Sequence, residues 1–109
     1  MVTWMIIGIP SDDGINVSEH FGRSERFLLA EVKGAQVLNK NFVDNPHNKE
    51  VNEQSGHGKL LKMLVDHNVN KVICFNLNPR MQKNLESLGI TVERCGIDSK
   101  INRILQHLK

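Results

Sequence analysis

The sequence predicts one α/β domain, built on a mixed five-stranded sheet with three helices. The hydrophobic patterns follow the order β-β-β-α-β-α-β-α, and the strand–helix–strand pattern of the second half is typical of parallel strands. The chain has 109 residues, the length of one ordinary domain, so residues 1–109 are interpreted as a single unit. Its 39% hydrophobic and 24% charged residues are typical of a globular protein with its own core.

The first half is expected to supply a central strand and a hairpin. Thr3–Ile9 is a short, nearly continuous apolar run, typical of a strand that is buried on both faces. Residues 26–32 and 36–43 are predicted to be two further strands, and Lys33 and Gly34 between them form a tight turn. This hairpin should extend the sheet on the far side of the first strand from the second half.

Two polar segments of the first half are predicted to be loops. Residues 10–24 contain turn-forming and polar residues with few apolar ones, and a loop of this length is usually functional or mobile. Residues 44–55 contain one apolar residue, Val51. We expect residues 46–55 to be poorly ordered without a ligand and to act as a lid that brings His47 toward the next helix.

A helix and a parallel strand are predicted to follow. The helix is expected over residues 58–67, with Asn68 ending it in a left-handed conformation. Residues 71–75 are apolar and β-branched, so we expect a strand there that runs parallel to the first. The apolar stripe of the helix consists of Leu60, Leu61, Leu64 and Val65.

The last two helices are predicted from their capping residues. Asn78 is an N-cap residue, and Pro79 follows at the first helical position. A strand over residues 90–93 comes next, parallel to its neighbour. Asp98 or Ser99 is expected to cap the final helix.

Composition excludes several classes of protein. Fourteen basic and twelve acidic residues leave a net charge of +2 with no basic tract, so we expect neither nucleic acid nor a membrane surface as a partner. The longest apolar stretch, Met5–Ile9, is far shorter than the ~20 residues that span a bilayer. No secretory signal pattern is present, which favours a cytoplasmic protein with Cys74 and Cys95 as reduced thiols.

The histidines are the first candidates for chemistry. His20, His47 and His57 fall in predicted loops or at a predicted loop–helix junction. Neutral imidazole is the commonest ligand of transition metals, and it suits iron as well as softer metals. Because no pair has ligand spacing such as HxxxH, ordinary exposed loop histidines remain the alternative interpretation.

His57 has a further predicted feature, because it is expected at the start of a helix. Unpaired N–H groups and the helix dipole favour an anion there and keep the imidazole neutral. Gly56 and Gly58 would let a bulky anion approach the backbone closely. A negatively charged metal–sulfur cluster or a phosphate would suit this place, although the segment lacks the P-loop pattern.

Asp12 and Asp13 are candidates for a different chemistry. They follow the first strand, and carboxylates at strand ends hold divalent cations in metal-dependent phosphoryl transfer. Asp-Asp-Gly is also an ordinary turn sequence, which is the more frequent explanation.

Four segments of the chain together resemble a known family. The segments are Ile9-Pro10-Ser11-Asp12-Asp13-Gly14, Val17-Ser18-Glu19-His20-Phe21-Gly22-Arg23, Asn45-Pro46-His47 and Gly56-His57-Gly58. They resemble the dinitrogenase iron–molybdenum cofactor biosynthesis family of small nitrogenase accessory proteins, over about residues 5–108. The resemblance implies a ribonuclease H-like fold with a mixed five-stranded sheet.

The resemblance also implies a function and a site. The function is that of a non-enzymatic binding or carrier protein for an iron–sulfur-type cluster, or for the iron–molybdenum cofactor or its precursor. Proteins that donate and receive the metallocluster would be its partners. The cofactor-binding residues would be His20, Phe21, Gly22, Arg23, Gly56, His57 and Gly58, with His20, His47 and His57 as metal ligands.

The sequence departs from the family pattern at one loop, and two alternative functions remain open. Family members often have a glycine-rich turn after the strand at 71–75, where this chain has Asn76-Leu77-Asn78-Pro79. One alternative is a metal-dependent phosphoryl hydrolase of ribonuclease H-like fold, which rests on analogy between folds. The other is an interaction module without cargo.

Overall fold

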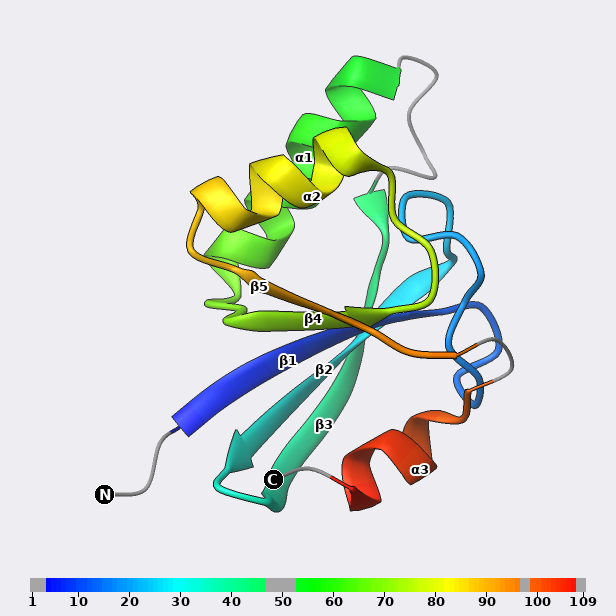
Figure 1. Cartoon of the computed structure of the whole chain (residues 1–109), viewed down its shortest axis with the longest axis vertical. Coiled ribbons are helices and arrows are strands. Elements are labelled where there is room, and N and C mark those ends of the chain that lie inside the picture. Colours follow the sequence, from blue (N-terminus) through cyan, green and yellow to red (C-terminus); the bar gives the residue numbers. More distant parts are fainter. Residues whose placement is uncertain (1–3, 47–52, 97–98, 108–109) are drawn as a thin grey trace.

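A computed structural model describes residues 4–46, 53–96 and 99–107 of the chain (Figure 1). The elements are, in chain order, β1 (Trp4–Ser11), β2 (Arg26–Lys33), β3 (Gln36–Asp44), α1 (Glu53–Asp66), β4 (Lys71–Cys74), α2 (Pro79–Ser87), β5 (Thr91–Arg94) and α3 (Ile101–Gln106). The predicted order of strands and helices is therefore confirmed. No helix among the described residues is long and apolar enough to cross a membrane.

The strands form one mixed five-stranded sheet in the order β3-β2-β1-β4-β5. β4 is parallel to both β1 and β5, and β2 is antiparallel to both β1 and β3. Only β2 therefore runs against the other strands. The prediction of a parallel β1-β4-β5 half, extended by a hairpin on the other side of β1, is confirmed.

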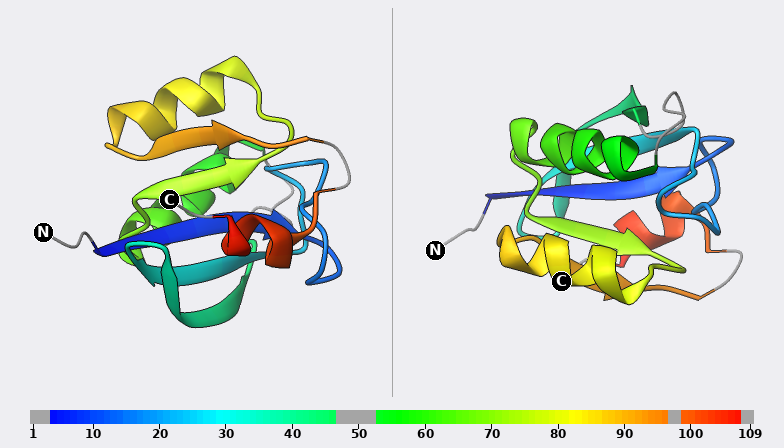
Figure 2. Two further views of the ribbon diagram at one scale, coloured as in Figure 1. Left: turned by 60° about the horizontal axis from the view of Figure 1, so that its bottom comes forward. Right: turned by 90° about the horizontal axis from the view of Figure 1, so that it is seen from above.

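Helices cover both faces of the sheet, and each face has its own core (Figure 2). α1 and α2 pack on one face, where Leu60, Leu64 and Leu85 are completely buried. α3 packs on the opposite face through Ile101 and Leu105. β1 is buried along its second half, as predicted for a strand between two layers.

Local turn signals in the sequence are confirmed where the backbone requires them. Gly34 in the β2–β3 turn has φ 63°, and Asn68 after α1 has φ 58°, both in the left-handed region. Asn78 caps α2, because its Oδ1 accepts a hydrogen bond of 2.8 Å from the Met81 N–H. Each of these positions follows from chemistry within a few residues of the chain.

The start of α1 differs from the prediction. The helix begins at Glu53 rather than at residue 58, so the glycine-flanked His57 lies inside it. A glycine inside a helix costs about 1 kcal/mol relative to alanine, which is why the sequence pattern predicted a later start. Packing of Leu60 and Leu64 against the sheet stabilises the helix beyond that local preference.

The predicted cap of α3 is also wrong. Lys100 is the N-cap residue and makes no side-chain cap hydrogen bond. The Ser99 hydroxyl donates to the Gly96 carbonyl instead, and Asp98 lies outside the described residues. The expectation for residues 46–55 falls mostly on residues 47–52, which also lie outside the described residues, whereas the chain from Glu53 onward is helical.

Candidate functional site

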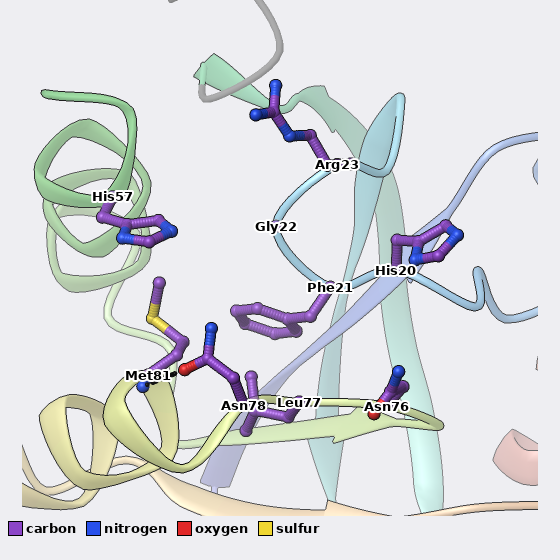
Figure 3. A pocket seen from close by; sticks show the side chains of 9 residues that line it. All are labelled: His20, Phe21, Gly22, Arg23, His57, Asn76, Leu77, Asn78 and Met81. Atoms are coloured by element: carbon purple, nitrogen blue, oxygen red, sulfur yellow. Dashed lines mark hydrogen bonds between the residues drawn. The ribbon is translucent and has the colours of Figure 1, made fainter. Parts of the chain in front are cut away.

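A cavity of about 240 Å³ opens at the end of the sheet where β1 and β4 finish (Figure 3). β1 and β4 are parallel neighbours, so the loops that follow them meet at one edge of the sheet. The side chain of His57 reaches the cavity from α1. The cavity is lined by His20, Phe21, Gly22, Arg23, His57, Asn76, Leu77, Asn78 and Met81.

The loop after β1, residues 12–25, lines the cavity with residues 20–23 and is named the first wall, and its carboxylates hold its shape. Asp12 accepts a hydrogen bond of 3.0 Å from the Ser18 hydroxyl and one of 2.9 Å from the Glu25 N–H. Asp13 accepts hydrogen bonds of 2.8 Å from the N–H groups of Asn16 and Ile15. These bonds, with the Asn16 bond contributing most, hold the pKa of Asp13 well below its usual range. Both carboxylates therefore act as turn acceptors.

The first wall is also bonded by a buried asparagine that directly follows β3. Asn45 is 1% exposed, and its Nδ2 group donates to the Ser24 carbonyl at 2.9 Å. The same group lies 3.3 Å from the Gly22 carbonyl and from the Ser24 hydroxyl. Asn45 thus fixes the segment that carries Arg23. The sequence identified Asn45 only as part of the Asn-Pro-His segment that resembles the family, and its buried contacts could not be predicted from the sequence.

Phe21 gives the cavity an apolar surface that belongs to the core. Its side chain is 3% exposed, and its ring centroid lies 5.1 Å from that of Phe27 in an edge-on contact. Figure 3 shows the ring at the centre of the lining, between the first wall and Met81. Substituting Phe21 would therefore change the core and the cavity together.

His57 projects into the cavity from α1, although not from a helix end. Figure 3 shows its ring directed into the space between α1 and the first wall. Since α1 starts at Glu53, the N–H groups of residues 57–60 bond within the helix, and the expectation that they meet an anion is wrong. Gly56 and Gly58 are not among the lining residues, and a Cβ at Gly58 would meet nothing within 4 Å.

The second wall, residues 76–78, faces the cavity together with the start of α2. Asn78 uses its Oδ1 for the helix cap, and its Nδ2 group faces the cavity in Figure 3. The helix N-terminus that borders the cavity is therefore that of α2, whereas the sequence predicted that of α1. The sequence did not predict Asn76, Leu77, Asn78 or Met81 as site residues. The available signal was their position after a strand that is parallel to β1.

The two predicted ligand histidines lie on opposite sides of this cavity. His57 points inward, whereas the exposed ring of His20 is turned away from His57 (Figure 3). His20 also lines a second depression beside Asp12 and Asp13. His47 lies outside the described residues. Within the part of the chain that the structure describes, no three His, Cys, Asp or Glu residues gather as a metal site.

Both cysteines are free thiols. Cys74 is completely buried at the end of β4, and this burial raises the pKa of its thiol to about 11. It therefore stays protonated at neutral pH and behaves as a small apolar core residue. Neither Cys74 nor the half-buried Cys95 is among the residues that line the cavity.

Known proteins resemble this chain in sequence and in fold. The uncharacterized protein MJ0580 of Methanocaldococcus jannaschii is 30% identical over 99 residues, which cover 90% of this chain and 80% of the relative. The crystal structure of PH0822 matches with a TM-score of 0.78 and 33% identity, over 94% of this chain and 86% of that one. The apo form of the orange protein from Desulfovibrio gigas has the same fold, with a TM-score of 0.76 and 17% identity, over 94% of this chain and 84% of that one.

The family assignment rests on a match along almost the whole chain. The family model described as "Dinitrogenase iron-molybdenum cofactor" matches residues 3–109. That range contains every strand and helix described above and all the residues that line the cavity. This chain belongs to the dinitrogenase iron–molybdenum cofactor family.

Proposed function

We propose that the protein binds and carries an anionic metal–sulfur cluster in the cavity, without catalysing a reaction on it. The cargo is an iron–sulfur-type cluster, or the iron–molybdenum cofactor or its precursor. The observation that carries the proposal is the chemistry of the lining, which among the described residues contains Arg23 and two histidines and no aspartate or glutamate. The family and the cavity at the start of α2 both support this cargo.

The lining residues divide into two roles toward such a cargo. His57 offers imidazole nitrogen to a metal in the cavity, and His20, whose ring would have to turn inward, and His47 are the other proposed ligands. Arg23 and Asn78 offer hydrogen-bond donors to the sulfur atoms, and the start of α2 adds its positive dipole end. Few protein ligands suit a cluster that must later be transferred. Proteins that donate and receive the cluster are therefore the proposed partners.

The fold and the location complete the proposal. A sheet in which only β2 runs against its neighbours supports the ribonuclease H-like assignment implied by the family. A cytoplasmic location suits the free thiols of Cys74 and Cys95. The hydrolase alternative receives no support from Asp12 and Asp13, because both carboxylates accept hydrogen bonds from their own loop.

Anaerobic reconstitution tests the proposal directly. Purified protein is incubated with ferrous iron and sulfide, with and without molybdate, then desalted and examined by metal analysis and visible absorption. We expect bound metal and a cluster absorption band in the parent protein, and a clear loss of both in His57→Ala. His107→Ala, an exposed histidine after α3, is the matched control and should retain the cluster like the parent.

The pH dependence of retention provides a second test. Imidazole binds a metal only when it is neutral, so retention by the parent should weaken on acidification.

A parent protein that holds no cluster would disprove the carrier function and favour an interaction module. Equal retention by the parent, His57→Ala and His20→Ala would disprove the proposed ligands.

A further inference from the structure

One side chain outside the cavity connects the second wall to two other segments. Arg94 is the last residue of β5 and is not among the lining residues. Its Nη2 atom donates a hydrogen bond of 2.9 Å to the Leu77 carbonyl and one of 3.1 Å to Oε1 of Gln82. A single guanidinium nitrogen therefore joins β5, the second wall and the first turns of α2.

This bond fixes a peptide group that borders the cavity. Among the described residues, the bond from Arg94 is the one hydrogen bond that the structure gives to the backbone of Asn76 and Leu77. The Leu77 side chain is buried in the core, so the residue is held at both its side chain and its carbonyl. With both groups held, the orientation of the peptide between Leu77 and Asn78 is determined.

The orientation of that peptide matters for an anion in the cavity. A trans peptide is planar, so its C=O and N–H groups point in opposite directions. Because the Leu77 carbonyl points toward Arg94 and β5, the Asn78 N–H points away from β5, and Figure 3 shows the cavity on the side of residues 76–78 that is away from β5. The same peptide leads directly into the N-terminus of α2 at Pro79.

We propose that Arg94 is a positioning residue of the cavity. By holding the Leu77 carbonyl outward, it keeps the Asn78 N–H and the start of α2 directed at the cargo. The proposal rests on the proposed carrier function and goes beyond it, because it assigns a role to a residue that does not line the cavity.

A matched control exists on the same pair of strands. Lys71 at the opposite end of β4 forms an ion pair of 2.7 Å with Glu93 of β5. Like Arg94→Met, Lys71→Met removes one positive charge and one side-chain contact of β5, but at the end of β4 that lies away from the second wall. Arg94→Lys keeps the charge on a shorter side chain, and it measures how much the position of the donor matters.

The first experiment examines the protein without cargo. Backbone ¹⁵N relaxation reports order parameters for residues 76–78 in the parent and in each variant. We expect these order parameters to fall in Arg94→Met, to recover in part in Arg94→Lys and to match the parent in Lys71→Met. Parental values in Arg94→Met would overturn the proposal, whatever the cargo is.

The second experiment measures release of a cluster reconstituted from ferrous iron and sulfide. We expect Arg94→Met to release it about five-fold faster than the parent, the factor that corresponds to one hydrogen bond. Arg94→Lys should be intermediate and Lys71→Met should match the parent. Equal release by Arg94→Met and Lys71→Met would overturn the positioning role. Absence of a cluster in the parent would instead disprove the carrier function, and the relaxation data would still decide whether Arg94 orders the second wall.

Discussion

The two walls of the cavity are held by bonds of different kinds. The first wall is held from inside the protein, because Asn45 and Ser24 are both completely buried and bond to each other. The second wall is held from the surface, by the exposed Arg94 and by the capping side chain of Asn78. Both walls face the same cavity and each places one side chain in the core, Phe21 and Leu77, but only the first wall is held by buried polar groups.

This difference separates stability from binding. Breaking a buried bond of the first wall leaves carbonyl groups without donors and without water, which destabilises the whole domain. Breaking a bond of the second wall leaves groups that water can reach, so the domain stays folded while the cavity changes shape. We therefore expect substitutions in the first wall to affect unfolding, and those in the second wall to affect the cargo.

The largest expected effect tests the first wall. In Asn45→Ala the carbonyls of Ser24 and Gly22 lose their donor, and we expect the free energy of unfolding to fall by about 2 kcal/mol. Urea denaturation followed by circular dichroism measures this change. Asn41→Ala removes the same side chain from an exposed position of β3 and serves as the control. Equal stability of the two variants would show that the first wall does not depend on its buried bonds.

Sequence predicts one wall better than the other, for a physical reason. The cap of α2 by Asn78 and the proline after it depend on neighbouring residues, so the sequence pattern predicted them correctly. The contact between Arg94 and Leu77 spans 17 residues. The sequence pattern predicted that β5 lies beside β4, but it could not predict that the last side chain of β5 reaches the second wall. The sequence therefore predicted that a helix starts after the second wall, but it did not predict that this segment lines the cavity.

The position of His57 also depends on packing that local sequence preference does not predict. Gly56 and Gly58 oppose a helix locally, and the prediction ended the loop at these residues. The helix continues because it buries Leu60 and Leu64 against the sheet, a contribution of packing rather than of local preference. His57 still reaches the cavity, but as a side chain from the second turn of α1 rather than from a helix terminus.

The second largest expected effect concerns the second wall, in a variant whose stability should equal that of the parent. Aspartate caps a helix as well as asparagine does, so Asn78→Asp should unfold at the same urea concentration as the parent. It also replaces the donor that faces the cavity with a negative charge, which repels an anionic cluster. We expect cluster retention to fall by about ten-fold, which corresponds to about 1.4 kcal/mol.

A neutral replacement controls for the loss of the donor alone. Asn78→Ser also caps the helix, but it introduces no charge. Metal analysis after desalting should therefore rank retention as parent, then Asn78→Ser, then Asn78→Asp. Full retention in Asn78→Asp would mean that the cargo is not an anion, or that it does not lie against the second wall.

The smallest effect tests whether exposed bonds of the first wall contribute at all. Hydrogen bonds from Asn16 and Ile15 hold the pKa of Asp13 well below its usual range, so the folded state favours the charged form. The resulting stabilisation is present above the ordinary carboxyl pKa of about 3.9 and is lost as pH falls below it toward the folded value. Parent and Asp13→Asn should therefore differ slightly in melting temperature at neutral pH and converge below about pH 3.9. Because Asp13 is fully exposed, solvent screens the interaction, and the difference should be much smaller than that for Asn45→Ala. A difference as large as that of Asn45→Ala would show that the first wall is held at its surface, as the second wall is.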